Sequence, residues 1–312
     1  MSQAETWTVK RLLEWTTEFF KKKGIDTPRL EAEILLAAAM KLRRIELYTH
    51  FETEPAESQR TLFREFVKRR GIGEPVAYLV GFKEFFSIPF KVNRTVLIPR
   101  PETEQLVLET LDILKTFSDT FSSFASSIST TSSTSSLSSS SQTSLVVCDV
   151  GTGSGAIAIA LAKNLPPSLK STTIIAVDLC PEALSVAESN AVANGVADRI
   201  EFRCSDLLTE VAGQFDVIVG NLPYISRSEY DVLPDDVRKF EPQQALLAGL
   251  KGTEVIERLA VQAAEKLKPG GFLLLECSPM IAESVVALFA DWKETRILKD
   301  NTGRQRFVIS CL

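Results

Sequence analysis

The sequence predicts an α/β fold whose core is a mainly parallel sheet. Short apolar, β-branched runs of strand length recur in the second half of the chain, at residues 145–150, 174–178 and 215–220. Segments with a helical pattern separate these runs, an alternation typical of parallel strands joined by helices. The first run also leads through a glycine-rich loop into a breaker-free segment, which favours a buried helix.

Length and composition indicate a globular protein of about two domains. The chain has 312 residues, of which 45% are hydrophobic and 24% charged, and its net charge of -5 argues against a nonspecific nucleic-acid binder, which needs a basic face. Its five cysteines are scattered, which predicts reduced core residues and no metal site. Since the sequence shows no signal-peptide core and no bilayer-spanning stretch, we expect a cytoplasmic monomer with no membrane partner.

Residues 1–74 are predicted to form a small N-terminal helical bundle. An apolar face that contains Trp15 and Phe20 predicts the first helix. Further helices are expected over residues 30–40 and 55–70, where apolar residues recur at helical spacing.

A β-hairpin linker is predicted for residues 75–96, because aromatic and β-branched residues alternate there with turn residues. The larger domain, residues 97–312, then begins with a proline-flanked Arg100, which we expect to pair with Glu102. Thr103 is in position to cap the helix that follows, at residues 104–114.

Residues 118–144 consist almost entirely of Ser and Thr. Such a composition buries too little apolar surface to offset the entropy lost on ordering. We therefore predict a flexible insertion just before the first strand of the sheet.

The glycine loop after that strand predicts a nucleotide cradle. Its glycines permit positive φ angles and a close approach of the backbone, while the following helix directs free N–H groups at the ligand. With Ala156 the run also satisfies the dinucleotide pattern G-x-G-x-x-G/A, so by itself it leaves NAD and S-adenosylmethionine open, as well as a plain tight turn. The loop consists of Gly151, Thr152, Gly153, Ser154 and Gly155.

Polar residues follow two further strands of the predicted sheet. Asp178 ends the second strand, where an acid can accept hydrogen bonds from ribose hydroxyls of either nucleotide. Asn221 follows the strand 215–220 and leads into Leu-Pro-Tyr, and at the carboxyl end of a parallel strand it faces the ligand crevice. A dehydrogenase has no need of that asparagine. Towards the C-terminus, two strands around residues 301–303 predict an antiparallel hairpin at one end of the sheet.

Four motifs together resemble the class I methyltransferases that methylate planar amino groups and carry an Asn/Asp-Pro-Pro-Tyr signature. They are DVGTGSGAIAIALA, the acid of AVD, SDLL at residues 205–208, and NLPY. Four more segments narrow the resemblance to the PrmC/HemK family of release factor glutamine N5-methyltransferases: GEPVAYLVG, VLIPRPETEQLV, EPQQALLAGLKG and GRQRFV. This resemblance covers nearly the whole chain apart from the insertion.

The resemblance implies a seven-stranded Rossmann-like class I methyltransferase domain, with an N-terminal bundle that contributes to recognition of the protein substrate. It also implies S-adenosyl-L-methionine as methyl donor, S-adenosyl-L-homocysteine as product, and the GGQ glutamine of class I peptide chain release factors as substrate. Asp206 and Leu207 are then expected to flank the adenine. The residues implied for cofactor binding are Gly151, Thr152, Gly153, Ser154, Gly155, Asp178, Asp206, Leu207 and Asn221.

Methylation of a carboxamide requires that its weakly nucleophilic nitrogen be oriented. The side-chain oxygen of Asn221 and the backbone carbonyl of Leu222 can accept its two N–H bonds, while Tyr224 packs on the amide plane and Pro223 stiffens the loop. No strong base is required, in keeping with a chain whose only histidine, His50, lies far from every motif.

The chain departs from the family pattern at two places. Leu222 stands where the family has proline, which keeps the carbonyl acceptor but loses a fixed φ, at an expected cost of about 0.5–1 kcal/mol. LECSPM, at residues 275–280, replaces a family segment with Gly and Gln.

Two alternatives stay open at this point. The same acceptor pair would serve a nucleic-acid amino-methyltransferase acting on adenine N6 or cytosine N4, against which the acidic balance and the PRPETE segment argue. The other alternative is a binding protein that keeps the cradle but has lost turnover through Leu222.

Overall fold

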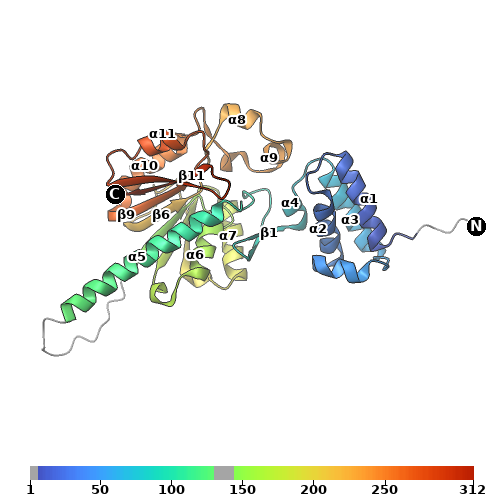
Figure 1. Ribbon diagram of the computed structural model, residues 1–312, viewed down its shortest axis with the longest axis horizontal. Helices are drawn as coiled ribbons and strands as arrows, with labels where there is room; N and C mark the ends of the chain where they lie inside the picture. The colour runs from blue at the N-terminus through green and yellow to red at the C-terminus, as the bar shows by residue number, and fades with distance from the viewer. Residues whose placement is uncertain (1–5, 130–143) are drawn as a thin grey trace, which may run out of the picture. The chain divides into compact units, whose positions relative to one another are not determined.

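The fold is taken from a computed structural model that describes residues 6–129 and 144–312, without the side chains of residues 119–129. The chain divides into two compact units (Figure 1). One consists of Met1–Phe82 with Pro234–Phe240, and the other of Lys83–Leu233 with Glu241–Leu312. Among the described residues, no helix combines the length and hydrophobicity that a membrane span needs.

The first unit is helical. Thr8 caps its first helix by accepting a hydrogen bond from Arg11 N, and a proline opens the second. Leu13 and Phe20 are fully buried, but Trp15, expected on the same face, is 52% exposed and stacks on Phe19. The unit contains α1 (Val9–Lys22), α2 (Pro28–Met40), η1 (Arg44–His50), α3 (Glu57–Arg70), α4 (Val76–Val80) and α9 (Asp235–Phe240).

A two-stranded hairpin follows, made of β1 (Phe82–Phe85) and β2 (Ile88–Lys91). Phe86 and Ser87 both have positive φ angles, 53° and 57°, as a two-residue type I′ turn requires. Part of the segment expected as hairpin, Val76–Val80, is instead the short helix α4.

The second unit contains the seven-stranded sheet, and the predicted class I methyltransferase architecture is confirmed. The strand order is β10-β11-β9-β6-β3-β4-β5, with β11 antiparallel to both of its neighbours and the remaining pairs parallel. The strands are β3 (Val146–Val150), β4 (Thr173–Asp178), β5 (Ile200–Cys204), β6 (Phe215–Gly220), β9 (Leu267–Glu276), β10 (Glu294–Lys299) and β11 (Gln305–Cys311).

Helices cover both faces of this sheet, so the central strands β3, β4 and β6 are buried on two sides (Figure 1). Along β3, Val147 packs with α5 (Thr103–Ser129), α6 (Ala156–Asn164) and α7 (Pro181–Ala193), whereas Cys148 packs with α10 (Glu254–Lys266) and α11 (Ala282–Ala287). Shorter elements complete the unit: η2 (Pro167–Leu169), η3 (Ala197–Arg199), β7 (Ile225–Ser226), α8 (Arg227–Asp231), η4 (Gln243–Ala245) and β8 (Leu247–Gly249).

The predicted flexible insertion at 118–144 is wrong for its first part. Helix α5 does not end near Leu114 but continues to Ser129. Extending a helix that is already formed requires no new nucleation, and the insertion contains neither Gly nor Pro to stop it. Residues 130–143 lie outside the described part of the chain, so the prediction is not tested there.

Asn190 ties the hairpin to the glycine loop. This α7 side chain is 1% exposed; its Oδ1 accepts a hydrogen bond from Lys91 N at 2.7 Å, and its Nδ2 donates to Lys91 O at 3.0 Å and to Ser154 O at 2.9 Å. One buried amide therefore connects three segments that lie far apart in sequence.

Asn190→Ala is expected to lower the free energy of unfolding by about 2–3 kcal/mol, because three buried hydrogen bonds are lost at once. Urea denaturation measures this. The control is Asn164→Ala, which removes one half-buried bond to Ala160 O within its own helix and should cost less than about 1 kcal/mol. Equal losses in the two variants would contradict the assigned role.

Candidate functional site

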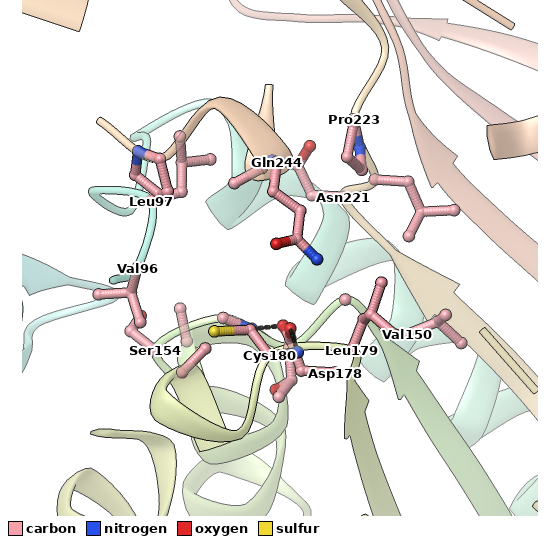
Figure 2. Close-up of a pocket in the computed structure, with 18 of the residues that line it drawn as sticks. Val96, Leu97, Val150, Ser154, Asp178, Leu179, Cys180, Asn221, Pro223 and Gln244 are labelled. Carbon is pink, nitrogen blue, oxygen red and sulfur yellow. Dashed lines mark hydrogen bonds between the residues drawn. The ribbon is translucent and has the colours of Figure 1, made fainter. Parts of the chain in front are cut away.

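A cavity of about 560 Å³ opens at the carboxyl ends of the central parallel strands (Figure 2). Such a volume suits a nucleotide-sized ligand. Of the residues singled out from the sequence, Gly155 and Tyr224 do not line the cavity. Those that do are Gly151, Thr152, Gly153, Ser154, Asp178, Asp206, Leu207, Asn221, Leu222 and Pro223.

The loop between β3 and α6 has a backbone that only glycine adopts without strain. Gly151, Gly153 and Gly155 have φ angles of 71°, 56° and 82°. A Cβ on Gly155 would lie 2.9 Å from Ile159 Cδ1 and 3.2 Å from Ala187 Cβ, so the tight turn has no room for a side chain. Gly151 N and Thr152 N both donate to Val177 O at 2.9 Å, so these N–H groups fasten the loop to β4, while residues 151–154 line the cavity.

Asp178 fixes this loop from the end of β4. Its Oδ2 accepts a hydrogen bond from Gly153 N at 2.8 Å and its Oδ1 one from Cys180 N at 2.9 Å (dashed in Figure 2). Burial raises the pKa of this carboxyl, and backbone N–H donors oppose the rise. Each carboxylate oxygen keeps a further lone pair, which leaves Asp178 able to accept from a ligand in the cavity.

Asp149, on β3, is hydrogen-bonded to the same loop, and the sequence did not predict this role. Its Oδ2 accepts from Thr152 Oγ1 at 2.6 Å and from Ala158 N at 3.1 Å. The side chain is fully buried, and this burial raises its pKa to about 7. The only sequence signal was a charged residue inside an otherwise apolar strand.

Asn221, which directly follows β6, is hydrogen-bonded to Thr103, and Thr103 is hydrogen-bonded in turn to Glu276. Asn221 Nδ2 donates to Thr103 Oγ1 at 3.0 Å, and the Thr103 hydroxyl donates to Glu276 Oε2 at 2.7 Å. The other carboxylate oxygen, Glu276 Oε1, accepts from the Tyr224 hydroxyl at 3.2 Å. Burial raises the pKa of both Glu276 and Tyr224.

Leu222, which stands where the family pattern has proline, is packed into the apolar core. Its side chain is 3% exposed and belongs to the apolar cluster beneath the site, together with Val150 and Cys277. A Cβ placed on Gly151 would come within 3.0 Å of Leu222 Cδ2. The leucine therefore lies directly against the glycine loop.

The expected pairing of Arg100 with Glu102 is wrong. Arg100 pairs with Glu241 instead, at 2.5 Å, and Glu241 also accepts from Ile98 N at 3.2 Å. Glu241 is buried, and its ion pair joins the segment that contains Arg100 to the segment that contains Glu241. Its carboxylate is therefore already paired and is not a free acid for a ligand. From the second of these segments, the Gln244 carboxamide points into the cavity (Figure 2).

Asp206 and Leu207 lie where β5 ends. The Asp206 carboxylate is paired with Arg258 at 2.5 Å, and both residues line the cavity. Leu207 has a φ of 56°, a strained conformation for a residue with a branched side chain, and is buried. Among the described residues, no group of three or more His, Cys, Asp and Glu side chains could hold a metal ion.

Comparison with known proteins gives consistent matches over both units. The PrmC N-terminal domain family matches residues 11–81, and the ribosomal protein L11 methyltransferase (PrmA) family matches residues 128–225. A release factor glutamine methyltransferase of Rhodopirellula baltica is 47% identical, over 97% of this chain and 95% of its own length. Another, from Koribacter versatilis, is 36% identical over 97% of this chain and 98% of its own length.

The buried Asp149 predicts a specific pH dependence of stability. Between its ordinary pKa of 3.8 and its raised value of about 7, the folded state holds a proton that the unfolded state has released. Its stabilising contribution is therefore complete below about pH 4 and is lost as the pH rises through 7.

Asp149→Asn removes this titration. The free energy of unfolding of the variant minus that of the wild-type protein is expected to rise by up to roughly 4 kcal/mol between about pH 4 and pH 8. Denaturant unfolding of both proteins across that range measures the difference. A difference that does not vary with pH would contradict the raised pKa.

Proposed function

This chain belongs to the release factor glutamine methyltransferase family, and on that premise we propose that it methylates the side-chain amide nitrogen of the GGQ glutamine in class I peptide chain release factors. The observation that carries the proposal is the position of Asn221 and Leu222. Both line the cavity that the glycine loop and Asp178 also line. The proposed nucleotide cradle and the two residues proposed to hold the carboxamide thus line one cavity.

For the methyl donor we propose S-adenosyl-L-methionine, which leaves as S-adenosyl-L-homocysteine. The glycines at 151 and 153 leave the cavity wall without bulky side chains there, and Asp178 keeps lone pairs for ribose hydroxyls. Asp206 and Leu207, which also line the cavity, are proposed to flank the adenine. When bound, this cofactor supplies an electrophilic methyl group on a sulfonium centre.

The chain's own residues then orient the nucleophile. The lone pair of a carboxamide nitrogen is delocalised into the carbonyl, so the reaction depends on positioning and on exclusion of water. Asn221 Oδ1 and the Leu222 carbonyl accept the two N–H bonds, which turns the nitrogen towards the methyl donor. Pro223 and the half-buried Tyr224 hold this loop, and the proton released after transfer passes to water.

We also propose that residues 1–74 recognise the release factor, residues 75–96 connect the domains, and residues 97–312 carry out the reaction. The enzyme is proposed to act as a cytoplasmic monomer, without a nucleic-acid or membrane partner.

Incubation of the purified chain with S-adenosylmethionine and a full-length class I release factor, followed by peptide mass spectrometry, tests the function. One added methyl on the GGQ glutamine is expected. Transfer to an adenine- or cytosine-containing oligonucleotide in place of the release factor would overturn the substrate assignment. Cofactor binding without any transfer would indicate a site disabled by Leu222, and Leu222→Pro should then restore activity.

Asn221→Ala is expected to lower methyl transfer by at least about a hundredfold, because it removes an acceptor that orients the amide. Cofactor affinity, measured by isothermal titration calorimetry, should change only a few-fold. Unchanged turnover would contradict the mechanism.

Asp178→Ala should show the opposite pattern. We propose that its carboxylate accepts hydrogen bonds from the ribose in the ground state, so cofactor binding is expected to weaken by about tenfold or more. Cofactor affinity equal to that of the unchanged protein would show that Asp178 does not contact the ribose.

A further inference from the structure

The hydrogen bonds between Asn221, Thr103 and Glu276 have a defined direction. An ionised carboxylate only accepts hydrogen bonds, whereas a hydroxyl has one proton to donate. Because the Thr103 proton is given to Glu276 Oε2 at 2.7 Å, the Thr103 oxygen acts as an acceptor towards Asn221. Only the amide nitrogen of Asn221 can donate to that oxygen, so Nδ2 is the atom directed at Thr103. The carbonyl oxygen Oδ1 is therefore the atom directed away from Thr103.

Both oxygens of the Glu276 carboxyl accept a hydrogen bond from a hydroxyl, one of them from Thr103. Tyr224 donates to its other oxygen at 3.2 Å, from the loop that carries the substrate acceptors. Burial raises the pKa of Glu276, and the hydrogen bond from Thr103 and the charge of Arg306, on β11, oppose this rise. Arg306 is itself held by Asp300 at 3.0 Å.

Thr103 is fixed independently of Asn221. It is 5% exposed and begins α5, and its backbone N–H donates to Arg100 O at 3.1 Å in the preceding turn. Its hydroxyl is therefore held between two partners from distant parts of the chain, 118 and 173 residues away.

We propose that Glu276 and Thr103 are positioning residues that set the orientation of the Asn221 carboxamide, so that Oδ1 instead of Nδ2 is offered to the substrate. This inference rests on the proposed function. A reversed Asn221 would present N–H donors to the N–H donors of the substrate amide and repel it.

The same arrangement determines which side chains are accepted. With Oδ1 and the Leu222 carbonyl both presented, the site offers two acceptors to the substrate amide. A glutamine amide nitrogen satisfies both acceptors. A glutamate carboxylate has only acceptor oxygens. It would leave both its own oxygens and the two acceptors of the site without donors, which disfavours its binding.

We call the hydrogen bonds from Asn221 to Thr103 and from Thr103 to Glu276 the relay. Thr103→Val tests it, because valine keeps the shape of threonine and removes the hydroxyl. The Asn221 amide then loses the partner that fixes it, and kcat for release factor methylation is expected to fall about tenfold. KM for the release factor should change less than kcat, and cofactor affinity should stay within about twofold. Thr103→Ser keeps the hydroxyl and should restore most of kcat.

The matched control is Thr110→Val, on the same helix. Thr110 is also fully buried, but its hydroxyl donates only to Leu106 O, at 2.8 Å in the preceding turn. This variant is expected to retain the kcat of the unchanged enzyme, which separates loss of the relay from general damage to α5.

The outcomes distinguish this inference from the function on which it rests. No methylation by the unchanged enzyme would overturn the proposed function. Normal methylation by the unchanged enzyme, together with an unaltered kcat in Thr103→Val, would overturn the relay alone. An equal fall in Thr103→Val and Thr103→Ser would also overturn it, because serine retains the donor.

Discussion

The site depends on the attachment of a glycine-rich loop to the sheet by buried polar groups. Glycines give the loop between β3 and α6 its close approach to the cavity, but they contribute no packing of their own. Asp149, Asp178 and Asn190 supply what is missing, each by hydrogen bonds to the loop or to the first turn of α6. Since the three come from β3, β4 and α7, the loop is held from three elements.

The part of the cavity around Asn221, where we propose that the substrate amide binds, is organised in a comparable way. Its acceptors belong to a short loop after β6, and buried groups from α5 and β9 hold that loop. In both places an ionisable group is placed away from water, where an unpaired polar atom is costly and a paired one is strongly directional. The chemistry of the site thus depends on side chains that do not themselves line the cavity, Asp149 and Glu276 among them.

The sequence predicts those parts of the site whose residues directly follow a predicted strand. The glycine loop, Asp178 and Asn221 each follow an apolar strand, and parallel strands bring their carboxyl ends together, so the predicted cavity residues are brought together. Contacts between distant segments carry no such local signal. Arg100 pairs with Glu241, 141 positions away, instead of the neighbouring Glu102, and the Thr103–Glu276 bond spans 173 positions. The end of α5 was misplaced because composition alone does not reveal that a helix already formed is extended cheaply.

A loop can be made stiff by a proline in its backbone or by burial of a side chain, and position 222 uses the second way. A proline ring restricts the backbone covalently, and its effect arises largely from fewer unfolded conformations. The leucine found here instead stiffens the loop by burial, within the cluster that contains Val150 and Cys277. Apolar burial weakens on cooling and in urea, whereas a covalent ring does not. In this chain the geometry of the substrate loop is therefore tied to the integrity of the apolar core beneath it, and to temperature, more closely than it would be with proline.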